Sequence, residues 1–131
     1  MPYILDADWA VHTLAGRPPY VETLRRLEPE GLALSWVTVG EVYEGAFGLP
    51  NPQGHLASFR RFLKPLRILG LNDPIMEYFA EVRALLRRRG ELIPDLDIIV
   101  GATALHHDLT VLTNDRHFAR IPDLKLYQSN K

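Results

Sequence analysis

The sequence predicts an α/β fold, a three-layer α/β/α sandwich with a central, mostly parallel sheet. Short apolar runs alternate with longer segments whose apolar residues recur at helical spacing, a pattern typical of a parallel sheet covered by helices on both faces. One run, residues 110–113, is apolar and β-branched, as expected of a buried parallel strand. The chain has 131 residues, 47% of them hydrophobic, and can bury one core. We therefore expect a single domain over residues 1–131.

The first strand is predicted at residues 3–5. The acids Asp6 and Asp8 end this apolar run, on opposite sides of the chain if it stays extended. Residues 9–14 are apolar enough for a short helix, which a Gly-Arg-Pro-Pro sequence breaks. Apolar residues at helical spacing then predict a second helix over residues 21–27.

The second strand is predicted at residues 32–37. Thr38 and Glu41 have the spacing of a capping box, so we expect the next helix to begin at Thr38. A loop with two prolines precedes an amphipathic helix over residues 56–63. A third strand is predicted at residues 67–71.

The C-terminal half begins with a long helix predicted from Asn72, which a basic run and a glycine end. The next helix, over residues 94–105, opens with a proline, and Asp95 or Asp97 can accept amide protons at its start. The remaining predictions are a strand at 110–113, one helical turn at 118–121 and a short strand at 125–127.

The composition excludes several classes of function. The chain has no cysteines, which excludes disulfides, thiolate zinc sites and cysteine nucleophiles. Its formal net charge of −1 argues against an extended basic surface for nucleic acid. The N-terminus has no basic leader region, and no apolar run approaches the ~20 residues of a membrane span. We expect a soluble, cytoplasmic protein with no membrane segment.

Four acids fall where predicted strands end or helices begin: Asp6, Glu41, Asp97 and Asp115. In parallel α/β sheets these positions gather at one edge, where ligands bind. A pocket with several carboxylates and no cysteine suits Mg²⁺ or Mn²⁺. Such ions activate water and stabilise charge on a phosphodiester, so no protein nucleophile is needed.

Each acid also has a structural interpretation. Asp115 can be a turn residue after a strand, Glu41 the second half of a capping box, and Asp97 an acid favoured by the helix dipole. Asp6 is the hardest to explain in this way, because it directly follows a strand at the sheet centre. Two further acids, Asp8 and Asp95, are second-tier candidates, each as a cap or a support for a ligand. We assign no metal to any of the five histidines.

Four blocks together resemble the motifs of the PIN-domain ribonucleases, and in particular the VapC-type toxins of prokaryotic toxin–antitoxin pairs. The blocks are YILDAD (3–8), SWVTVGE (35–41), DIIVGATA (97–104) and LTNDRHF (112–118). The resemblance implies a PIN-like α/β/α sandwich whose acids bind Mg²⁺ or Mn²⁺ for RNA cleavage. Carried over, the family's four acids fall on Asp6, Glu41, Asp97 and Asp115, and Thr113 matches a small hydroxyl residue near the fourth. Gly101 stands where the family often has alanine.

The resemblance also implies partners: an RNA substrate, a cognate antitoxin and a second copy of the chain in a homodimer. Arginine pairs well with carboxylates, so we expect a basic side chain of the antitoxin to reach the acidic pocket.

Two other functions compete with this one. An aspartate pair after a first strand also resembles the opening motif of haloacid-dehalogenase-type phosphatases, in which Asp6 would be the covalent nucleophile and Asp8 the acid and base. That class also needs a lysine, and the sequence offers no convincing one. The other alternative is a non-catalytic PIN-like scaffold that binds RNA or a partner without cutting. RNA cleavage that EDTA abolishes would separate these functions.

Overall fold

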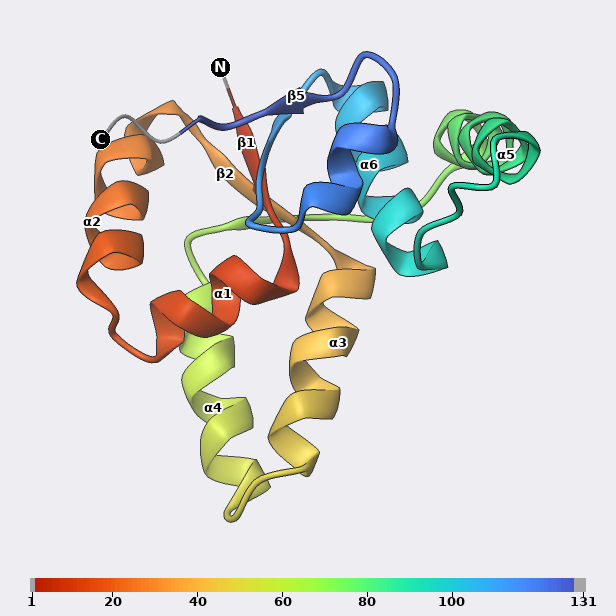
Figure 1. The fold of residues 1–131 in the computed structure, drawn as a ribbon. Helices are drawn as coiled ribbons and strands as arrows, with labels where there is room; N and C mark the ends of the chain where they lie inside the picture. The colour runs from red at the N-terminus through yellow and green to blue at the C-terminus, as the bar shows by residue number, and fades with distance from the viewer. Residues whose placement is uncertain (1, 129–131) are drawn as a thin grey trace.

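Five parallel strands form one sheet in the computed structural model, which describes residues 2–128. Their spatial order is β3-β2-β1-β4-β5, so the N-terminal strand lies at the centre (Figure 1). The strands are β1 (Tyr3–Leu5), β2 (Leu32–Ser35), β3 (Arg67–Leu69), β4 (Thr110–Leu112) and β5 (Lys125–Leu126). The predicted α/β fold with a parallel central sheet is confirmed.

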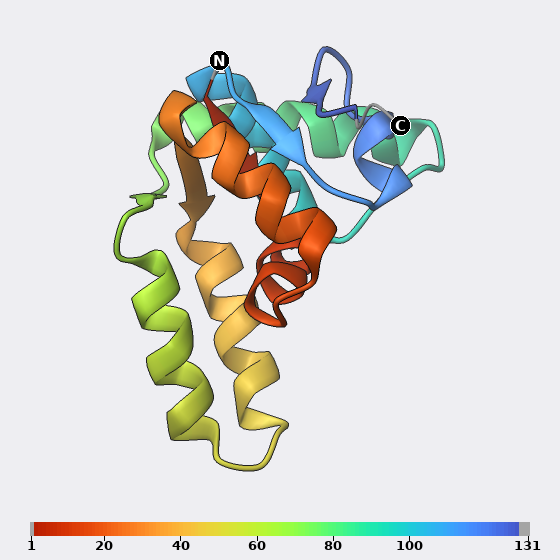
Figure 2. The same ribbon diagram turned by 90° about the vertical axis from the view of Figure 1, so that its left-hand side faces the viewer.

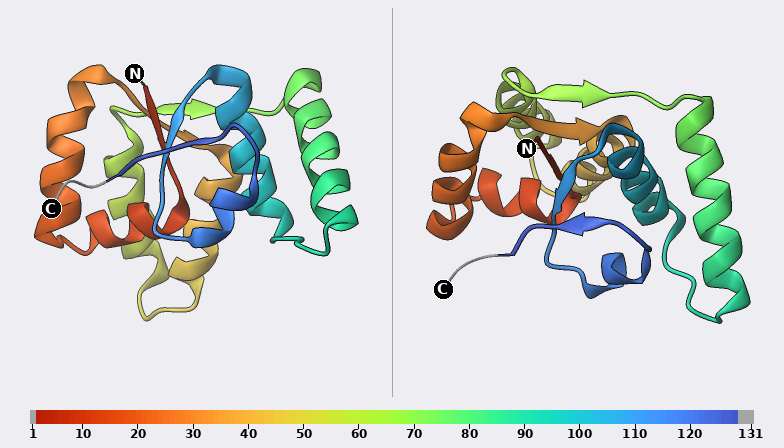
Figure 3. Two further views of the ribbon diagram at one scale, coloured as in Figure 1. Left: turned by 45° about the horizontal axis from the view of Figure 1, so that its top comes forward. Right: turned by 90° about the horizontal axis from the view of Figure 1, so that it is seen from above.

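Helices cover both faces of this sheet, as the view from above in Figure 3 shows. The helices are α1 (Ala7–Leu14), α2 (Pro18–Leu27), α3 (Trp36–Phe47), α4 (Pro52–Leu63), α5 (Asp73–Arg88) and α6 (Asp95–His107). The described residues also form two short 3-10 helices, η1 (Glu28–Glu30) and η2 (Arg116–Arg120). Among residues 2–128, no helix has the length and apolar character needed to cross a bilayer.

The alternation of strand side chains divides the core into two layers. Ile4 faces a cluster built with α5 and α6, whereas its neighbour Leu5 faces a cluster built with α1 to α4. On β4, Val111 and Leu112 divide in the same way. All four side chains are fully buried. The central strands are therefore apolar on both faces, which explains why they read as continuous apolar runs.

The strand order reverses at β1, because the chain builds β2 and β3 on one side of it and then crosses to β4 on the other. Leu5 and Leu112 are register partners, and the amide of Asp6 donates to the carbonyl of Leu112 (3.2 Å). The carboxyl ends of β1 and β4 thus lie side by side at the switch point, where open α/β sheets bind their ligands.

Helices α3 and α4 form an antiparallel pair that projects beyond the rest of the molecule (Figures 1 and 2). Tyr43 of α3 meets Phe59 of α4 edge to face, with ring centroids 5.7 Å apart. The side chain of Arg60 lies over the same tyrosine ring, 5.1 Å from its centroid. The pair is held by aromatic packing on its inner side.

The start of α3 differs from the prediction. The helix begins at Trp36, and Ser35 is its N-cap, with its hydroxyl accepting from the amide of Val37 (3.2 Å). The predicted capping box of Thr38 and Glu41 is therefore wrong. Thr38 is fully buried, and its hydroxyl has no hydrogen-bond partner among residues 2–128. The strand before it is correspondingly shorter than predicted and ends at Ser35.

Two other helix starts also differ. Asp6 is the N-cap of α1, so the helix begins directly after it at Ala7, two residues earlier than predicted, and Asp8 lies in its first turn. At α6 the N-cap is Pro94, without a side-chain cap, so neither Asp95 nor Asp97 caps this helix as expected. At α1 the carboxylate of Asp6 caps the helix, whereas α6 begins without a side-chain cap.

Candidate functional site

An acidic pocket of about 370 Å³ opens at the carboxyl edge of the sheet. Its lining comes from segments far apart in the sequence: the end of β1 and start of α1, the helices α3 and α6, and the loop after β4. The lining residues are Asp6, Ala7, Asp8, Glu41, Asp97, Asn114 and Asp115. All four acids singled out from the sequence therefore meet in one pocket.

Asp6 is the most buried of these acids, with 7% of its surface exposed. The amide of Trp9 donates to its Oδ1 (2.9 Å), and the Thr113 hydroxyl donates to its Oδ2. Burial raises the pKa of Asp6 to about 6 despite these two hydrogen bonds, with smaller contributions from the charges of Asp8 and Asp97. The carboxylate is thus fixed in place but poorly solvated.

Glu41 and Asp97 come from α3 and α6. Glu41 is the sixth residue of its helix, not part of the first turn as predicted. Burial raises the pKa of both carboxyls. The charge of Asp97 raises the pKa of Glu41 further, and the charge of Asp115 does the same for Asp97. The pocket therefore places negative charges close enough to repel one another.

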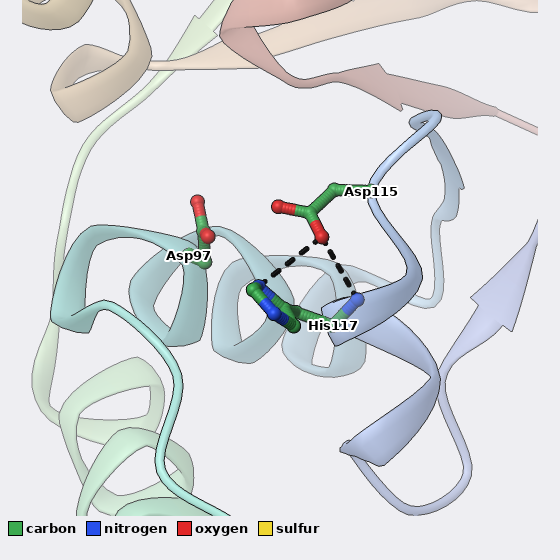
Figure 4. A group of neighbouring side chains, drawn as sticks. All are labelled: Asp97, Asp115 and His117. Carbon is green, nitrogen blue, oxygen red and sulfur yellow. Dashed lines mark hydrogen bonds and ion pairs between the residues drawn. The ribbon is translucent and has the colours of Figure 1, made fainter.

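Asp115 caps η2 and lies half-exposed at the pocket. Its Oδ1 accepts from the amide of His117 (2.9 Å), and the Nδ1 of the His117 ring lies 3.2 Å from the same oxygen (Figure 4). Its own amide donates to the Thr113 hydroxyl (2.9 Å). Because that hydroxyl also donates to Asp6, Thr113 connects the first and fourth acids.

The second-tier candidates Asp8 and Asp95 lie in different places. Asp8 lines the pocket and accepts from the Asn114 amide (3.3 Å). Asp95 does not line the pocket, because its carboxylate pairs with Arg83 (2.7 Å) on the neighbouring helix α5. The two acids at the start of α6 therefore face different surroundings.

His117 is the residue that sequence reasoning missed. Asp97, Asp115 and His117 each offer a potential ligand atom, and these atoms all lie within 4.8 Å of one another. The histidine follows the fourth acid by two positions and lies in the short segment η2 that this acid caps, a spacing that could have suggested contact. Nothing in the local pattern indicates the direction of its ring.

The donor set fits a divalent cation. The pocket gathers oxygen ligands from carboxylates whose pKa values are raised by burial and by mutual repulsion. A bound cation would stabilise the ionised form of these carboxylates and so offset both effects. Oxygen-rich sites suit Mg²⁺, Mn²⁺ and Ca²⁺. The acidic cluster can hold a metal ion.

Comparison with known proteins gives a consistent result. The family model described as "PIN domain" matches residues 3–124. The "Ribonuclease VapC2" of Haemophilus influenzae is 30% identical in an alignment of 128 residues that covers 95% of this chain and 96% of that protein. The "tRNA(fMet)-specific endonuclease VapC" of Salmonella typhimurium is 25% identical, covering 96% of each chain.

Solved structures show the same fold. The chain aligns with VapBC2 of Rickettsia felis, solved with a DNA fragment from its promoter, with a TM-score of 0.92, 24% identity and coverage of 99% of this chain and 100% of that one. DNA-bound VapBC of Salmonella typhimurium aligns with a TM-score of 0.89, 25% identity and 97% coverage of both chains. The similarity extends over nearly the full length in each case.

Proposed function

The chain belongs to the PIN domain family, and from this premise we propose that its acidic pocket is the active site of a metal-dependent endoribonuclease of the VapC type, the toxin of a toxin–antitoxin pair. The observation that carries the proposal is the convergence of acids from separate segments in one pocket at the topological switch point. The chain has no cysteine, and no lysine lines the pocket. We therefore assign the chemistry to an activated water rather than to a cysteine or lysine nucleophile.

The ligands proposed for the ion are Asp6, Glu41, Asp97 and Asp115, and the ion proposed is Mg²⁺ or Mn²⁺. When bound, the ion supplies a more acidic water and neutralises charge on the phosphate. The protein's own contribution is to hold the carboxylates in place. Thr113 is the positioning residue, since its hydroxyl donates to Asp6 and accepts from the Asp115 amide.

The partners follow from the relatives. The similar solved structures are VapBC toxin–antitoxin complexes, so this chain has an antitoxin partner, and RNA is its substrate. A basic side chain of the antitoxin reaching the acidic pocket remains our proposal, because an arginine satisfies paired carboxylates well. The expected homodimer stays a prediction that a mass measurement in solution tests.

RNA cleavage by the purified chain tests the assignment. We expect Mg²⁺-dependent cleavage that EDTA abolishes, and loss of cleavage by at least about 100-fold in Asp6→Asn and Asp97→Asn, because each change removes a ligand charge. Asp95→Asn is the matched control: it lies on the same helix but outside the pocket, and it should cut normally. Undiminished cleavage by both pocket variants would remove these acids from the mechanism.

The two alternatives give different results in the same assay. A non-catalytic scaffold would bind RNA without cutting it. A phosphatase with Asp6 as nucleophile would release phosphate from small phosphate esters, and its charge-balancing lysine is missing from the pocket lining. The comparisons favour the ribonuclease over both.

A further inference from the structure

A histidine stands beside two carboxylates of the acidic pocket. The Nδ1 of His117 lies 3.2 Å from Oδ1 of Asp115, and ligand atoms of Asp97, Asp115 and His117 all lie within 4.8 Å of one another (Figure 4). Two atoms bound to one ion at ~2.1 Å lie at most about 4.2 Å apart. Small side-chain rotations therefore bring the three groups to a common ion.

The histidine is presented by an anchored turn. Its amide donates to Asp115 (2.9 Å), and the next residue, Phe118, is buried in the core under α6. On the other side of the turn, Ile121 is also buried and lies against Gly101 of α6, where a Cβ would come within 2.5 Å of its Cδ1. The backbone at His117 is thus fixed, while 47% of its side chain remains exposed and its ring contacts Asp115 at the pocket.

We propose that His117 is a nitrogen ligand on the Asp97–Asp115 side of the metal site, and that it shifts the ion preference of the pocket away from Mg²⁺ toward Co²⁺ and Zn²⁺. This inference rests on the proposed function, because it takes the acidic pocket as the site of the catalytic ion. Carboxylate oxygens suit Mg²⁺, whereas imidazole nitrogen suits later first-row metals, whose affinity for mixed sites is higher. A purely carboxylate pocket would show this preference more weakly.

Metal titration of the full, untagged chain tests the inference. Isothermal titration gives the affinities for Mg²⁺, Mn²⁺ and Zn²⁺, and the visible absorption of bound Co²⁺ reports whether nitrogen is a ligand. His117→Asn is the informative variant, because the amide nitrogen of asparagine can still donate to Asp115 but offers no imidazole nitrogen to an ion. His117→Gln serves if the first variant does not fold.

His12→Asn is the matched control. The ring of His12 lies 3.4 Å from Asp8, another acid of the pocket, but it belongs to no group of potential ligands found among residues 2–128. The His12→Asn variant therefore tests whether the loss of a histidine near the pocket changes ion affinity through local charge alone.

We expect His117→Asn to weaken Zn²⁺ and Co²⁺ binding by about 10-fold or more, to change Mg²⁺ binding by less than about 3-fold, and to alter the Co²⁺ spectrum. His12→Asn should change none of these. Unchanged Zn²⁺ affinity, or an equal loss for Mg²⁺ and Zn²⁺, would overturn the inference, since the histidine would then act only by holding Asp115. If the parent cuts RNA with Mg²⁺, the proposed function stands in either case. If the parent binds no divalent ion, both the inference about His117 and the proposed function are wrong.

Discussion

At the scale of single residues, the hydroxyl of Thr113 links two acids of the pocket, Asp6 and Asp115. It donates to Asp6 and accepts from the amide of Asp115, so its orientation is fixed from both sides. Thr113→Val keeps the shape and removes both hydrogen bonds. We expect a loss of about 10–100-fold in Mg²⁺ affinity or cleavage rate, the usual cost of removing a group that orients a metal ligand.

Thr113→Ser is the control, because it retains the hydroxyl. It should preserve most of the activity and the Mg²⁺ affinity measured by titration. A loss in the serine variant without a loss in the valine variant would point to packing of the methyl group instead.

Asp97 gives a second prediction at this scale. Its pKa is raised by burial and by Asp115, so its ionised form is disfavoured in the folded protein, and it caps no helix. In EDTA, Asp97→Asn should melt about 3 °C higher than the parent. The rise in melting temperature that Mg²⁺ causes should shrink, since ligand stabilisation follows occupancy of the folded state.

Calorimetry or circular dichroism measures both quantities, with Asp95→Asn as the control outside the pocket. A lower melting temperature in EDTA together with an unchanged Mg²⁺ response would show that Asp97 acts structurally and does not bind the ion.

At the scale of elements, the start of α3 allows a test between two N-caps, Ser35 as observed and Thr38 as the sequence suggested. Ser35 caps the helix, whereas the hydroxyl of Thr38 is buried without a partner in the described chain. Ser35→Ala should therefore cost about 1 kcal/mol of unfolding free energy. Thr38→Val, which has nearly the same shape, should cost nothing or stabilise slightly, because it removes an unpaired buried hydroxyl.

Urea denaturation of both variants, with metal absent, measures the two free energies. A loss of about 1 kcal/mol in Thr38→Val and none in Ser35→Ala would restore the capping box that the sequence suggested.

At the scale of the whole molecule, the acidic pocket makes metal-free stability depend on pH. Folded Asp6 keeps its proton up to about pH 6, whereas the unfolded chain releases it near 3.8. The folded state binds more protons in this interval, so raising the pH across it favours unfolding. The raised pKa values of Glu41 and Asp97 act in the same direction.

We expect the unfolding free energy in EDTA to fall between about pH 4 and pH 6, by roughly 3 kcal/mol from Asp6 alone. Asp6→Asn should flatten this decline, because asparagine caps a helix as well as aspartate and does not titrate. Denaturant titrations across the pH range measure both curves. A parent whose unfolding free energy rises over this interval would contradict the raised pKa of Asp6.

Much of the fold and the position of the four acids follow from the sequence alone. Strands buried on both faces must be apolar, and residues after them must lie at the carboxyl edge, so Asp6 and Asp115 were predictable as neighbours. The family motifs fixed the same four positions. These features depend on local pattern and on rules of chain topology, which a sequence carries directly.

Only the tertiary structure decided which way the side chains face. Asp95 and Asp97 are about 200° apart around a helix, so one at most can face the pocket. Helix α6 is buried on most of its surface, and its sequence therefore marks no single inner face. Packing against α5 and β4 sets the rotation, which turns Asp97 to the pocket and Asp95 to Arg83.

The same reason explains His117 and Thr113. Their partners lie on other segments, Asp97 on α6 and Asp6 after β1, and the contacts exist only once the sheet brings those segments together. The sequence by itself determined which acids stand at the edge of the sheet. The packing of the helices determined which groups reach them.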